Sequence, residues 1–450
     1  MRALAIFLVG ILLVGPAGAL VVPHPGPSAV ALAAQQVVPL PDDIKDAEVL
    51  ALLAASMGWR VERLPIPTPA PGLTVSDMVL RLGARAGVPV APGDAAAFAA
   101  LDAQLAAPLL VLLVAVEEAW VLRDEAFADV TQEMIDEARR AMAAGDVESM
   151  ALALEPANIE LLVTAAIMLS DTIESVVIPG LQAASDAGVW PASEIADPVG
   201  VLRVGGTGDD VETVDRIVQV DARGNDAYYN NAGGTTVLSD FDQTTIDTPI
   251  AAHIDLAGDD KYYSDSNGPA QGSAEIGIGI AYDIGGNDTY WCNKHCAGGA
   301  SAGVGIHRDT AGDDAYRGVE FSFGFGNYGI GFLRNDVGNE TYTTSTQSGG
   351  YGYPRAVALL WDRSGTDLYR GSGGGMELYG FGRDGGRGWF VDEGSEIDAW
   401  QNIPNGDPHP KMCNDCIWSA GRPSPTGKGN DNQGGLAYLL AYQENFPPVG

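Results

Sequence analysis

The chain has 450 residues and carries 59 acidic against 25 basic side chains, a formal net charge of −34. A surface this acidic repels a phosphate backbone and gains nothing from counterion release, so nucleic acid is not an expected partner. It suits a protein that binds divalent cations, and equally a plain solvated surface. Composition changes near residue 200, because only 13 of the 58 glycines lie in residues 1–200 and every tyrosine and cysteine follows. We therefore expect two domains.

The first 19 residues have the layout of a secretory signal peptide. Arg2 precedes an apolar stretch from Leu4 to Val14, and small residues follow at Ala17–Ala19. We expect residues 1–19 to be removed and the protein to be secreted or held at the cell surface, with no stable membrane span after cleavage. An uncleaved anchor is the alternative, although the apolar run is short for a spanning helix.

Residues 20–198 have the pattern of an α-helical domain with a Pro-rich joint at 65–71, where the prolines neither pair in a sheet nor continue a helix. Two long stretches repeat apolar residues at three- and four-residue steps, which predicts one apolar stripe on each helix. These stretches are 101–120, with a bend expected at Pro108, and 159–173; shorter helices are expected at 44–57, 76–86 and 132–144. This half contains no evident ligand cluster, and we interpret it as a scaffold.

An eight-residue phrase, Asp-x-x-Gly-[Asn/Asp]-Asp-x-Tyr, returns through the second half at a nearly fixed interval. Full copies lie at 221–228, 255–262, 283–290 and 309–316, looser copies at 338–342 and 362–369, and a degraded copy at 392–400. The glycines of the copies from Gly258 to Gly365 are 28, 26, 26 and 27 residues apart, which is right for one or two strands plus a turn per unit. Between copies, glycine alternates with apolar residues, as in 276–280, and this predicts strands with one bulky and one bare face.

From these features we predict an α+β protein in two domains, an N-terminal α-helical domain followed by a Gly/Asp-rich β-solenoid of the β-helix or β-roll kind. The solenoid is expected at 199–435, built from 26–28-residue repeats and closed by a Cys-containing C-terminal cap, with a tail at 436–450. No unit of this size buries a core alone, so the units must stack, at roughly 4.8 Å per coil. Equivalent Asp and Tyr residues should then lie in register. The helical domain is expected to cover the open N-terminal edge of the solenoid.

Two interpretations of the repeated turn remain open. In the structural one, Asp and Asn side chains accept hydrogen bonds in Asx-turns, glycine takes the positive-φ position and each Tyr stacks on the next. In the functional one, two carboxylates per unit line up as hard oxygen ligands suited to calcium. Stacked carboxylates without a cation would repel each other in every layer, which favours bound ions. The carboxylate pairs are Asp255 with Asp260, Asp283 with Asp288, and Asp309 with Asp314.

The turns also carry a family resemblance. The segment Gly205–Val211 reads Gly-Gly-Thr-Gly-Asp-Asp-Val, and with the Gly-x-Asp-x-Tyr core of the turns it resembles the RTX calcium-binding nonapeptide, Gly-Gly-x-Gly-x-Asp-x-apolar-x. The resemblance implies a parallel β-roll in which glycine carbonyls and an Asp carboxylate bind calcium between coils. It implies the ligands Asp210, Asp226, Asp260, Asp288, Asp314 and Asp367. The chain departs from the family in its longer interval, and Glu212 stands where the family has an apolar residue.

The four cysteines form two closely spaced pairs, Cys292 with Cys296 and Cys413 with Cys416. In an exported chain disulfides are the default, although a four-Cys zinc site has compatible local spacings. Several coils separate the two pairs, about 20 Å by the strand spacing, unless the tail folds back. We therefore expect two local disulfides.

Residues 299–303 match the Gly-x-Ser-x-Gly pattern, but a nucleophile elbow requires a strand-turn-helix context, and Ser301 is expected in a Gly-alternating strand. No local exception to the repeat combines carboxylates with a basic residue. We therefore interpret the chain as a binding or structural module rather than an enzyme, with calcium as the expected cofactor and an extracellular glycan or protein as the expected partner. The alternative is a β-helix carbohydrate-active enzyme, a polysaccharide lyase or glycoside hydrolase.

Overall fold

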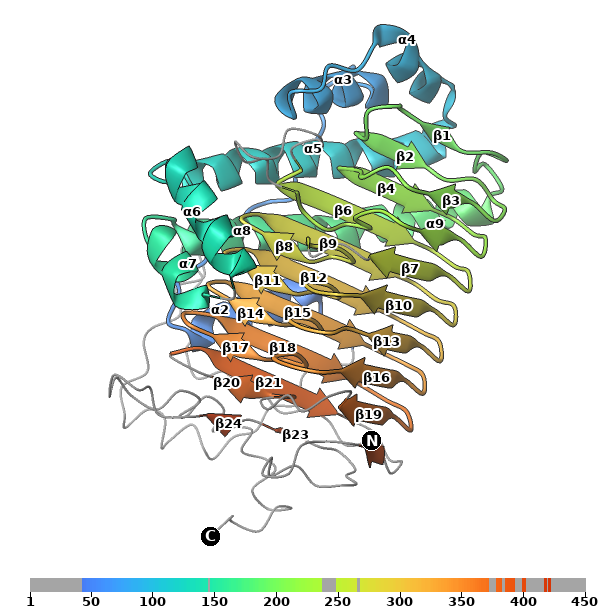
Figure 1. The fold of residues 1–450 in the computed structure, drawn as a ribbon. Helices are drawn as coiled ribbons and strands as arrows, with labels where there is room; N and C mark the ends of the chain where they lie inside the picture. Colours follow the sequence, from blue (N-terminus) through green and yellow to red (C-terminus); the bar gives the residue numbers. More distant parts are fainter. Residues whose placement is uncertain are drawn as a thin grey trace.

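The computed structural model describes residues 43–144, 146–236, 248–264 and 268–371, with short segments at 378–382, 385–392, 399–401, 417–418 and 420–421. In these ranges a helical region precedes a parallel β-solenoid, so the predicted two-part α+β fold is confirmed (Figure 1). The expected signal peptide at 1–19 and tail at 436–450 lie outside the described residues.

The solenoid consists of three sheets, and a full coil contributes one strand to each. The long-strand sheet has the order β1 (Ile195–Ala196), β2 (Leu202–Val204), β4 (Val218–Asp221), β6 (Ile250–Asp255), β9 (Ile278–Asp283), β12 (Val304–Asp309), β15 (Ile330–Asn335), β18 (Val357–Asp362), β21 (Arg387–Asp392) and β23 (Ile417–Trp418). Its terminal pairs, β1 with β2 and β21 with β23, are antiparallel, and the pairs between them are parallel.

The other two sheets are made of shorter strands. The tyrosine sheet contains β3 (Val211–Glu212), β5 (Ala227–Tyr228), β7 (Lys261–Ser264), β10 (Thr289–Cys292), β13 (Ala315–Arg317), β16 (Thr341–Thr344), β19 (Leu368–Gly371) and β22 (Ala399–Gln401). The third sheet contains β8 (Ala274–Glu275), β11 (Ala300–Ser301), β14 (Gly326–Asn327), β17 (Gly352–Tyr353), β20 (Phe381–Gly382) and β24 (Ala420–Gly421). Neighbouring strands in each come from successive repeats, which is the stacking that the repeat interval predicts.

Equivalent residues of successive repeats lie in register. Asp283 pairs with Asp255 in the preceding coil and with Asp309 in the next. In the tyrosine sheet, Tyr290 pairs in the same way with the tyrosines of the neighbouring coils. From Tyr228 to Tyr342 the rings stack with centroids 4.7 to 4.9 Å apart, which is the spacing of neighbouring strands. The predicted register of Asp and Tyr is therefore confirmed.

The alternation of glycine with apolar residues gives the long strands two different faces. In β9, Ile278 and Ile280 belong to the same apolar core as the helices. The intervening Gly279 lies where an added Cβ would collide with the backbone carbonyl of Ser273. Gly305 occupies the equivalent position in β12. The bare face therefore points into the solenoid, where the third sheet approaches, and the bulky face points toward the helices.

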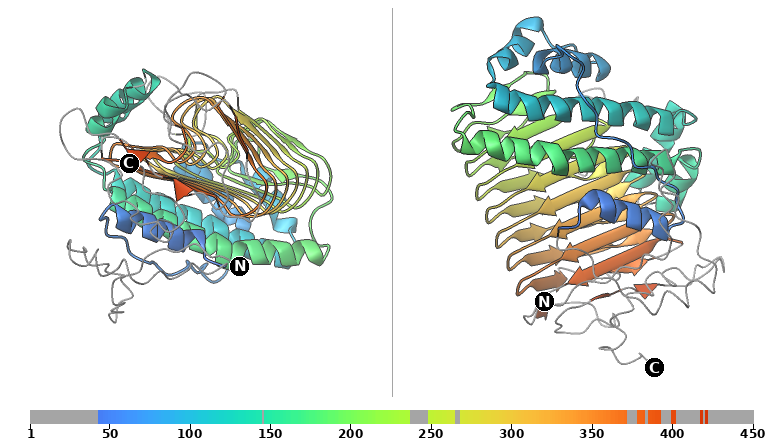
Figure 2. Two further views of the ribbon diagram at one scale, coloured as in Figure 1. Left: turned by 90° about the horizontal axis from the view of Figure 1, so that it is seen from below. Right: turned by 180° about the vertical axis from the view of Figure 1, so that it is seen from behind.

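The helices lie on the outside of the solenoid (Figures 1 and 2). They are α2 (Asp46–Ser56), α3 (Val75–Arg85), α4 (Pro92–Ala95), the 3₁₀ turn η1 (Ala96–Ala100), α5 (Ala103–Ala126), α6 (Gln132–Ala143), α7 (Val147–Ala153), α8 (Ile159–Thr172), the π-helical turn η2 (Ile173–Val177) and α9 (Ile178–Asp186). Asp102 caps α5 by accepting a hydrogen bond from the Gln104 amide, and the helix continues through Pro108.

The longer helices cover a side of the solenoid. Figure 2 shows α5, α8 and α2 lying across the outer face of the long-strand sheet, where they contact β6, β9 with β12, and β15, respectively. At the N-terminal end of the solenoid, η1 contacts the edge strand β1, and α3 and α4 lie beyond that strand (Figure 1). The expectation that helices cover this edge thus agrees with α3, α4 and η1, whereas the longer helices lie along a side. The physical reason is area, because the isoleucine- and valine-rich face spans many coils whereas β1 is two residues long.

Two stretches of the helical layer are long and apolar enough to cross a membrane, namely α5 and the run from Ile159 to Asp186. Most of each apolar window is buried inside the protein. Core helices of soluble proteins pass the same test of length and composition, so these stretches are weak evidence for a membrane span.

A buried ionic network fastens the helices to the sheet. Arg334 of β15 donates to Asp46 at the start of α2, at 2.9 Å, and to Asp336 at 2.7 Å. Arg308 of β12 donates to Asp336 at 2.7 Å and to Glu174 at 2.8 Å. Glu174 in turn accepts from the Asp46 amide at 3.1 Å, although burial and the nearby Asp46 carboxyl raise the pKa of Glu174 to about 8. Arginines of the solenoid thus bind the ends of helical elements that are far away in sequence.

This network predicts that Arg334→Ala destabilises the protein by about 3–5 kcal/mol, because the buried Asp46 carboxylate loses a charge partner. The matched control is Arg355→Ala, which breaks an exposed pair with Glu155 and should cost at most about 1 kcal/mol. Chemical denaturation of both variants measures the difference. Equal stability of the two variants would contradict the importance of the network.

A candidate metal centre in the stacked turns

Each repeat ends its long strand with an aspartate that shapes the following turn. Asp283, the last residue of β9, accepts a hydrogen bond from the Gly285 amide through Oδ1, at 3.1 Å. Its Oδ2 accepts from the hydroxyl of Tyr262 in the preceding coil, at 2.7 Å. Asp255 and Asp309 make the equivalent contacts. The Asx-turns and the tyrosine stack of the structural interpretation are thus both present.

A second aspartate, five residues later, joins one coil to the next. Oδ1 of Asp288 accepts from the Asp260 amide at 2.6 Å, and the Asp288 amide donates to Asp314 at 2.7 Å. The other carboxylate oxygen, Oδ2, is buried in both Asp260 and Asp288 and makes no hydrogen bond within the described part of the chain. In Asp260 and Asp288, one oxygen therefore serves the backbone, while the second is left without a donor among the described residues.

The two kinds of aspartate meet in groups of three carboxylates inside the solenoid. Within each group the candidate ligand oxygens lie within 4.8 Å of one another. The groups are Asp210, Asp221 and Asp226; Asp226, Asp255 and Asp260; Asp260, Asp283 and Asp288; Asp288, Asp309 and Asp314; and Glu340, Asp362 and Asp367. Neighbouring groups share a turn aspartate, so the first four form a continuous carboxylate column.

The groups contain all nine aspartates proposed from the sequence as metal ligands. They also contain Asp221, Asp362 and Glu340, which were not among the proposed ligands. Copies of the repeated phrase include all three, as first aspartate of a copy or as the acidic residue before Tyr342. Applying the paired-carboxylate pattern to every copy would therefore have found them.

Burial makes it costly for these carboxyls to carry charge. Burial, followed by the nearby carboxyls of Asp255 and Asp283, raises the pKa of Asp260 to about 10. Burial, followed by the Asp283 carboxyl, raises the pKa of Asp288 to about 11. At neutral pH such groups are neutralised either by protons or by a cation that binds several of them at once.

The first group of the column contains a cation that belongs to the protein. Arg203 of β2 is fully buried and donates to Asp221 at 2.9 Å and to Asp210 at 3.0 Å. It also pairs with Glu194 at 2.8 Å and with Glu212 at 3.3 Å. The RTX-like segment 205–211 therefore contributes Asp210 to a set of carboxylates that binds a guanidinium. The repeat pattern could not reveal Arg203, because that residue precedes the first copy.

The column is interrupted where the repeat itself changes. Asn335 takes the position of the strand-end aspartate in β15, in register with Asp309 and Asp362. Its Nδ2 donates to Asp314 Oδ2 at 3.2 Å. Among the described residues, no group of three carboxylates includes both Asp314 and Glu340. The Asn335 amide thus gives Asp314 the hydrogen bond that Oδ2 of Asp260 and of Asp288 lacks among the described residues.

On the exposed side of the same turns, aspartate alternates with asparagine from one coil to the next. Asp259 is followed in the next coils by Asn287, Asp313 and Asn339, and each backbone amide donates at 2.9 Å to the side-chain oxygen of the coil before it. Asn287 also donates its Nδ2 to Asp259 at 3.1 Å. Carboxylates are therefore two coils apart on the outside, whereas the interior column places them in adjacent coils.

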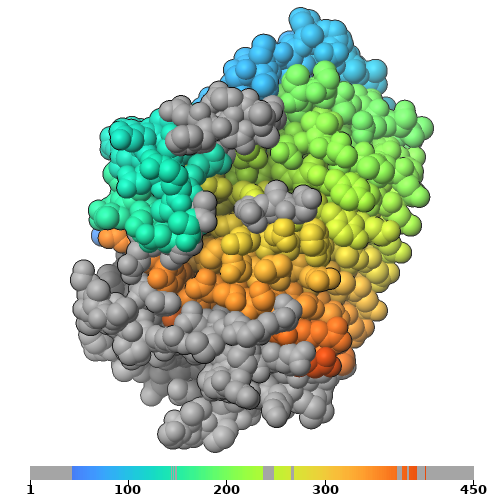
Figure 3. All heavy atoms as spheres, in the orientation of Figure 1, coloured from blue at the N-terminus to red at the C-terminus, as the bar shows by residue number. Residues whose placement is uncertain are grey.

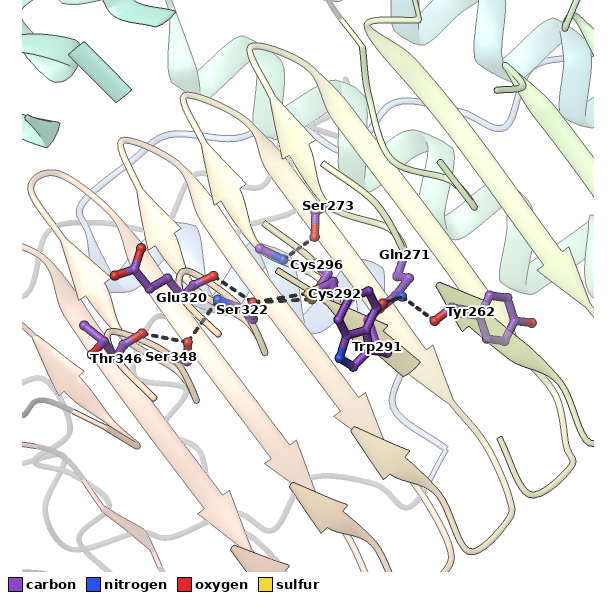
Figure 4. Close-up of a disulfide and its surroundings, with 11 residues drawn as sticks. Tyr262, Gln271, Ser273, Trp291, Cys292, Cys296, Glu320, Ser322, Thr346 and Ser348 are labelled. Atoms are coloured by element: carbon purple, nitrogen blue, oxygen red, sulfur yellow. Dashed lines mark hydrogen bonds between the residues drawn. A yellow bond between two sulfur atoms is a disulfide. The ribbon is translucent and has the colours of Figure 1, made fainter. Parts of the chain in front are cut away.

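The first cysteine pair forms the predicted local disulfide. Cys292 at the end of β10 is bonded to Cys296, and both are buried. Figure 4 shows the pair beside Ser322 of the next coil, whose hydroxyl lies 3.3 Å from the Cys296 sulfur. The second pair, Cys413 and Cys416, lies outside the described residues, as does most of the expected C-terminal cap.

Ser301, which matches the pattern of a nucleophile elbow, is fully buried in β11. Its strand pairs with β8 and β14 and leads into β12, not into a helix. Its hydroxyl has no hydrogen-bond partner within the described residues. The strand-turn-helix context that an elbow requires is thus absent at this position.

Comparison of the chain with models of known families, with curated proteins and with solved structures finds no match. The fold and the site accordingly define a class, a parallel β-solenoid with a buried column of carboxyl groups and a lateral layer of helices.

The turn geometry predicts opposite tolerances for two adjacent glycines. A Cβ on Gly286 would collide with the backbone carbonyl of Gly258 in the neighbouring coil, so Gly286→Ala should destabilise the protein by about 1–3 kcal/mol. The control Gly285→Ala places its Cβ 3.6 Å from the nearest atom and matches Ala257 and Ala311 in other repeats, so stability should hardly change. Melting curves compare the two. Equal tolerance would mean that the coils do not depend on this close approach.

Proposed function

We propose that this chain is a secreted or cell-surface structural and binding module whose β-solenoid is stabilised by calcium ions held in the carboxylate column. The observation that carries the proposal is the series of buried three-carboxylate groups, of which the first is neutralised by the protein's own Arg203. The second and third groups consist of aspartates alone, and the described contacts of these aspartates include no guanidinium. In those groups a metal cation would neutralise the carboxylates, as Arg203 does in the first coil.

The donor set favours calcium over other common metals. Every candidate ligand is a carboxylate oxygen, which suits hard cations and offers no nitrogen or sulfur for zinc. Magnesium prefers to keep several waters in octahedral order, whereas these groups are buried. The resemblance of Gly205–Val211 to the RTX repeat supports the same cation, with a longer repeat unit.

Two further features support the location and the non-enzymatic character that we propose. The Cys292–Cys296 disulfide is of the kind that persists in oxidising compartments, in agreement with the signal-like segment at 1–19. The buried carboxyls repeat from coil to coil and also hold the turns, so they serve the stack as a whole. An extracellular glycan or protein is the partner class that a repetitive solenoid surface suits.

The proposal predicts that calcium raises the melting temperature of the full chain and that a chelator lowers it. Ions that bind only the folded coils stabilise them by mass action, by about 2.7 kcal/mol when free calcium is a hundredfold above its dissociation constant. In a domain of this size, each kcal/mol corresponds to a shift of about 2–4 °C. Calorimetric melting in calcium, in magnesium and in chelator measures the response. Identical curves in calcium and chelator would leave the turns purely structural.

A pair of variants locates the ions. Asp288→Asn removes one carboxylate from two adjacent groups while it keeps the oxygen that accepts from the Asp260 amide. In chelator this variant should be at least as stable as the parent chain, since a buried charge is removed; in calcium its gain should be roughly halved. The control Asp259→Asn, on the exposed side of a turn, should keep the full calcium response. A full response from both variants would place calcium elsewhere.

A further inference from the structure

The outer face of the tyrosine sheet carries a second series of aromatic side chains, the outer aromatic column, formed by Tyr229, Tyr263 and Trp291. The rings of Tyr229 and Tyr263 lie nearly parallel with centroids 5.6 Å apart, and Trp291 follows at 6.1 Å, tilted by 51°. Tyr229 is 55% exposed, and the other two are half-buried. Among the described helices, none lies over the tyrosine sheet, whose coils form an open face of the molecule (Figures 1 and 3).

Two basic side chains without internal partners adjoin this column. Arg317 continues it in the next coil, in register with Trp291, and Lys261 lies two residues before Tyr263 on the same face. Both are exposed, and within the described chain neither makes an ion pair or a side-chain hydrogen bond. Arg203 and Arg334, in contrast, are fully engaged in buried pairs. An acidic chain thus presents two available cationic donors beside its exposed aromatic rings.

The charge around the column is locally balanced. Asp259 and Asp313 are exposed in the turns that lead into β7 and β13, close to Lys261 and Arg317 in sequence. Beyond about 8 Å, salt screens the remaining acidic surface at physiological ionic strength, so these neighbours decide the local potential. A nearly neutral face is unsuited to capturing a polyanion, and the net charge of −34 opposes it further.

We propose that the outer aromatic column, together with Lys261 and Arg317, binds an uncharged polysaccharide chain that runs along the stack of coils. This inference rests on the proposed role as a binding module and names its partner class. The apolar C–H faces of pyranose rings pack against aromatic side chains, while their hydroxyl oxygens accept hydrogen bonds from lysine and arginine. A column of ring contacts at nearly regular spacing over three successive coils matches a ligand that is itself a linear repeat.

The dimensions of the column favour a glycan over a protein. The column is one side chain wide, and the outward positions beside it are occupied by polar or small residues such as Thr289 and Ala315. A stable protein interface needs a broader buried centre that excludes water. An anionic membrane is disfavoured by the acidity of the chain.

Titration calorimetry of the full chain with β-1,3- and β-1,4-linked gluco-oligosaccharides tests the proposal. Trp291→Ala should weaken binding about tenfold or more, since it removes the largest aromatic contact. Tyr229→Ala, at the most exposed ring, should weaken it as well without altering the fold. The control Thr343→Ala, in the coil after Arg317, should bind like the parent chain. Melting curves of each variant establish that the fold is intact.

Three results would overturn the inference. The first is that neither glucan binds. The second is that glucan binding survives both aromatic substitutions. The third is that polygalacturonate or anionic phosphatidylserine vesicles bind instead, with an affinity that falls steeply as the salt concentration increases. Running each titration in calcium and in chelator separates this inference from the proposed calcium site. If the chain binds no glycan but calcium still shifts its melting temperature, only the inference about the outer aromatic column is refuted. If the chain binds glycan but calcium does not shift its melting temperature, only the proposed calcium site is refuted.

Discussion

The stacking of equivalent residues at the spacing of β-strands is the constraint on which the rest of the structure depends. A side chain at a repeated position lies next to the same kind of side chain in the neighbouring coil. This is favourable for tyrosine, because its rings stack, and unfavourable for aspartate, because its charges repel. The chain resolves the penalty differently in different places. It alternates Asp with Asn on the outside of the turns, inserts Arg203 in the first coil and substitutes Asn335 in β15. The groups around Asp255 and Asp283 keep acidic residues in adjacent layers without such a device among their described contacts.

The same constraint explains why a solenoid of this composition carries a layer of helices. Glycine on the inner face of strands such as β9 and β12 lets the third sheet approach, and the isoleucine and valine side chains of these strands point outward. A face of isoleucine and valine that spans several coils cannot remain in water, and α5, α8 and α2 cover it. The helical region thus shares an apolar core with the outer face of the long-strand sheet. The ionic network around Arg334 and Glu174 sets the position of that layer.

Much of this architecture could be predicted from the sequence, because the number of residues between copies of a repeat indicates how many strands each coil contains. The register of Tyr290 with its neighbours and the bare face of Gly279 follow from the repeated phrase and the glycine alternation. Features that occur once were beyond such reasoning. Arg203 lies outside every copy, and the placement of α5 on a side of the solenoid depends on tertiary packing that no periodicity encodes. Each group of three carboxylates combines strand-end and turn aspartates from different copies of the phrase, and these meet only when the coils are stacked.

The structural and calcium interpretations of the turn are compatible, because the two oxygens of a carboxylate have different partners. In Asp288, Oδ1 accepts a hydrogen bond from the Asp260 amide, and Oδ2 has no donor among the described residues. Removing a cation would therefore leave the backbone bonds of the turn intact and expose only the electrostatic cost, which protons can also neutralise. Proton and metal compete for the same buried oxygens in this view. At Asp314 the side-chain amide of Asn335 donates instead, and its hydrogen is covalently part of the chain.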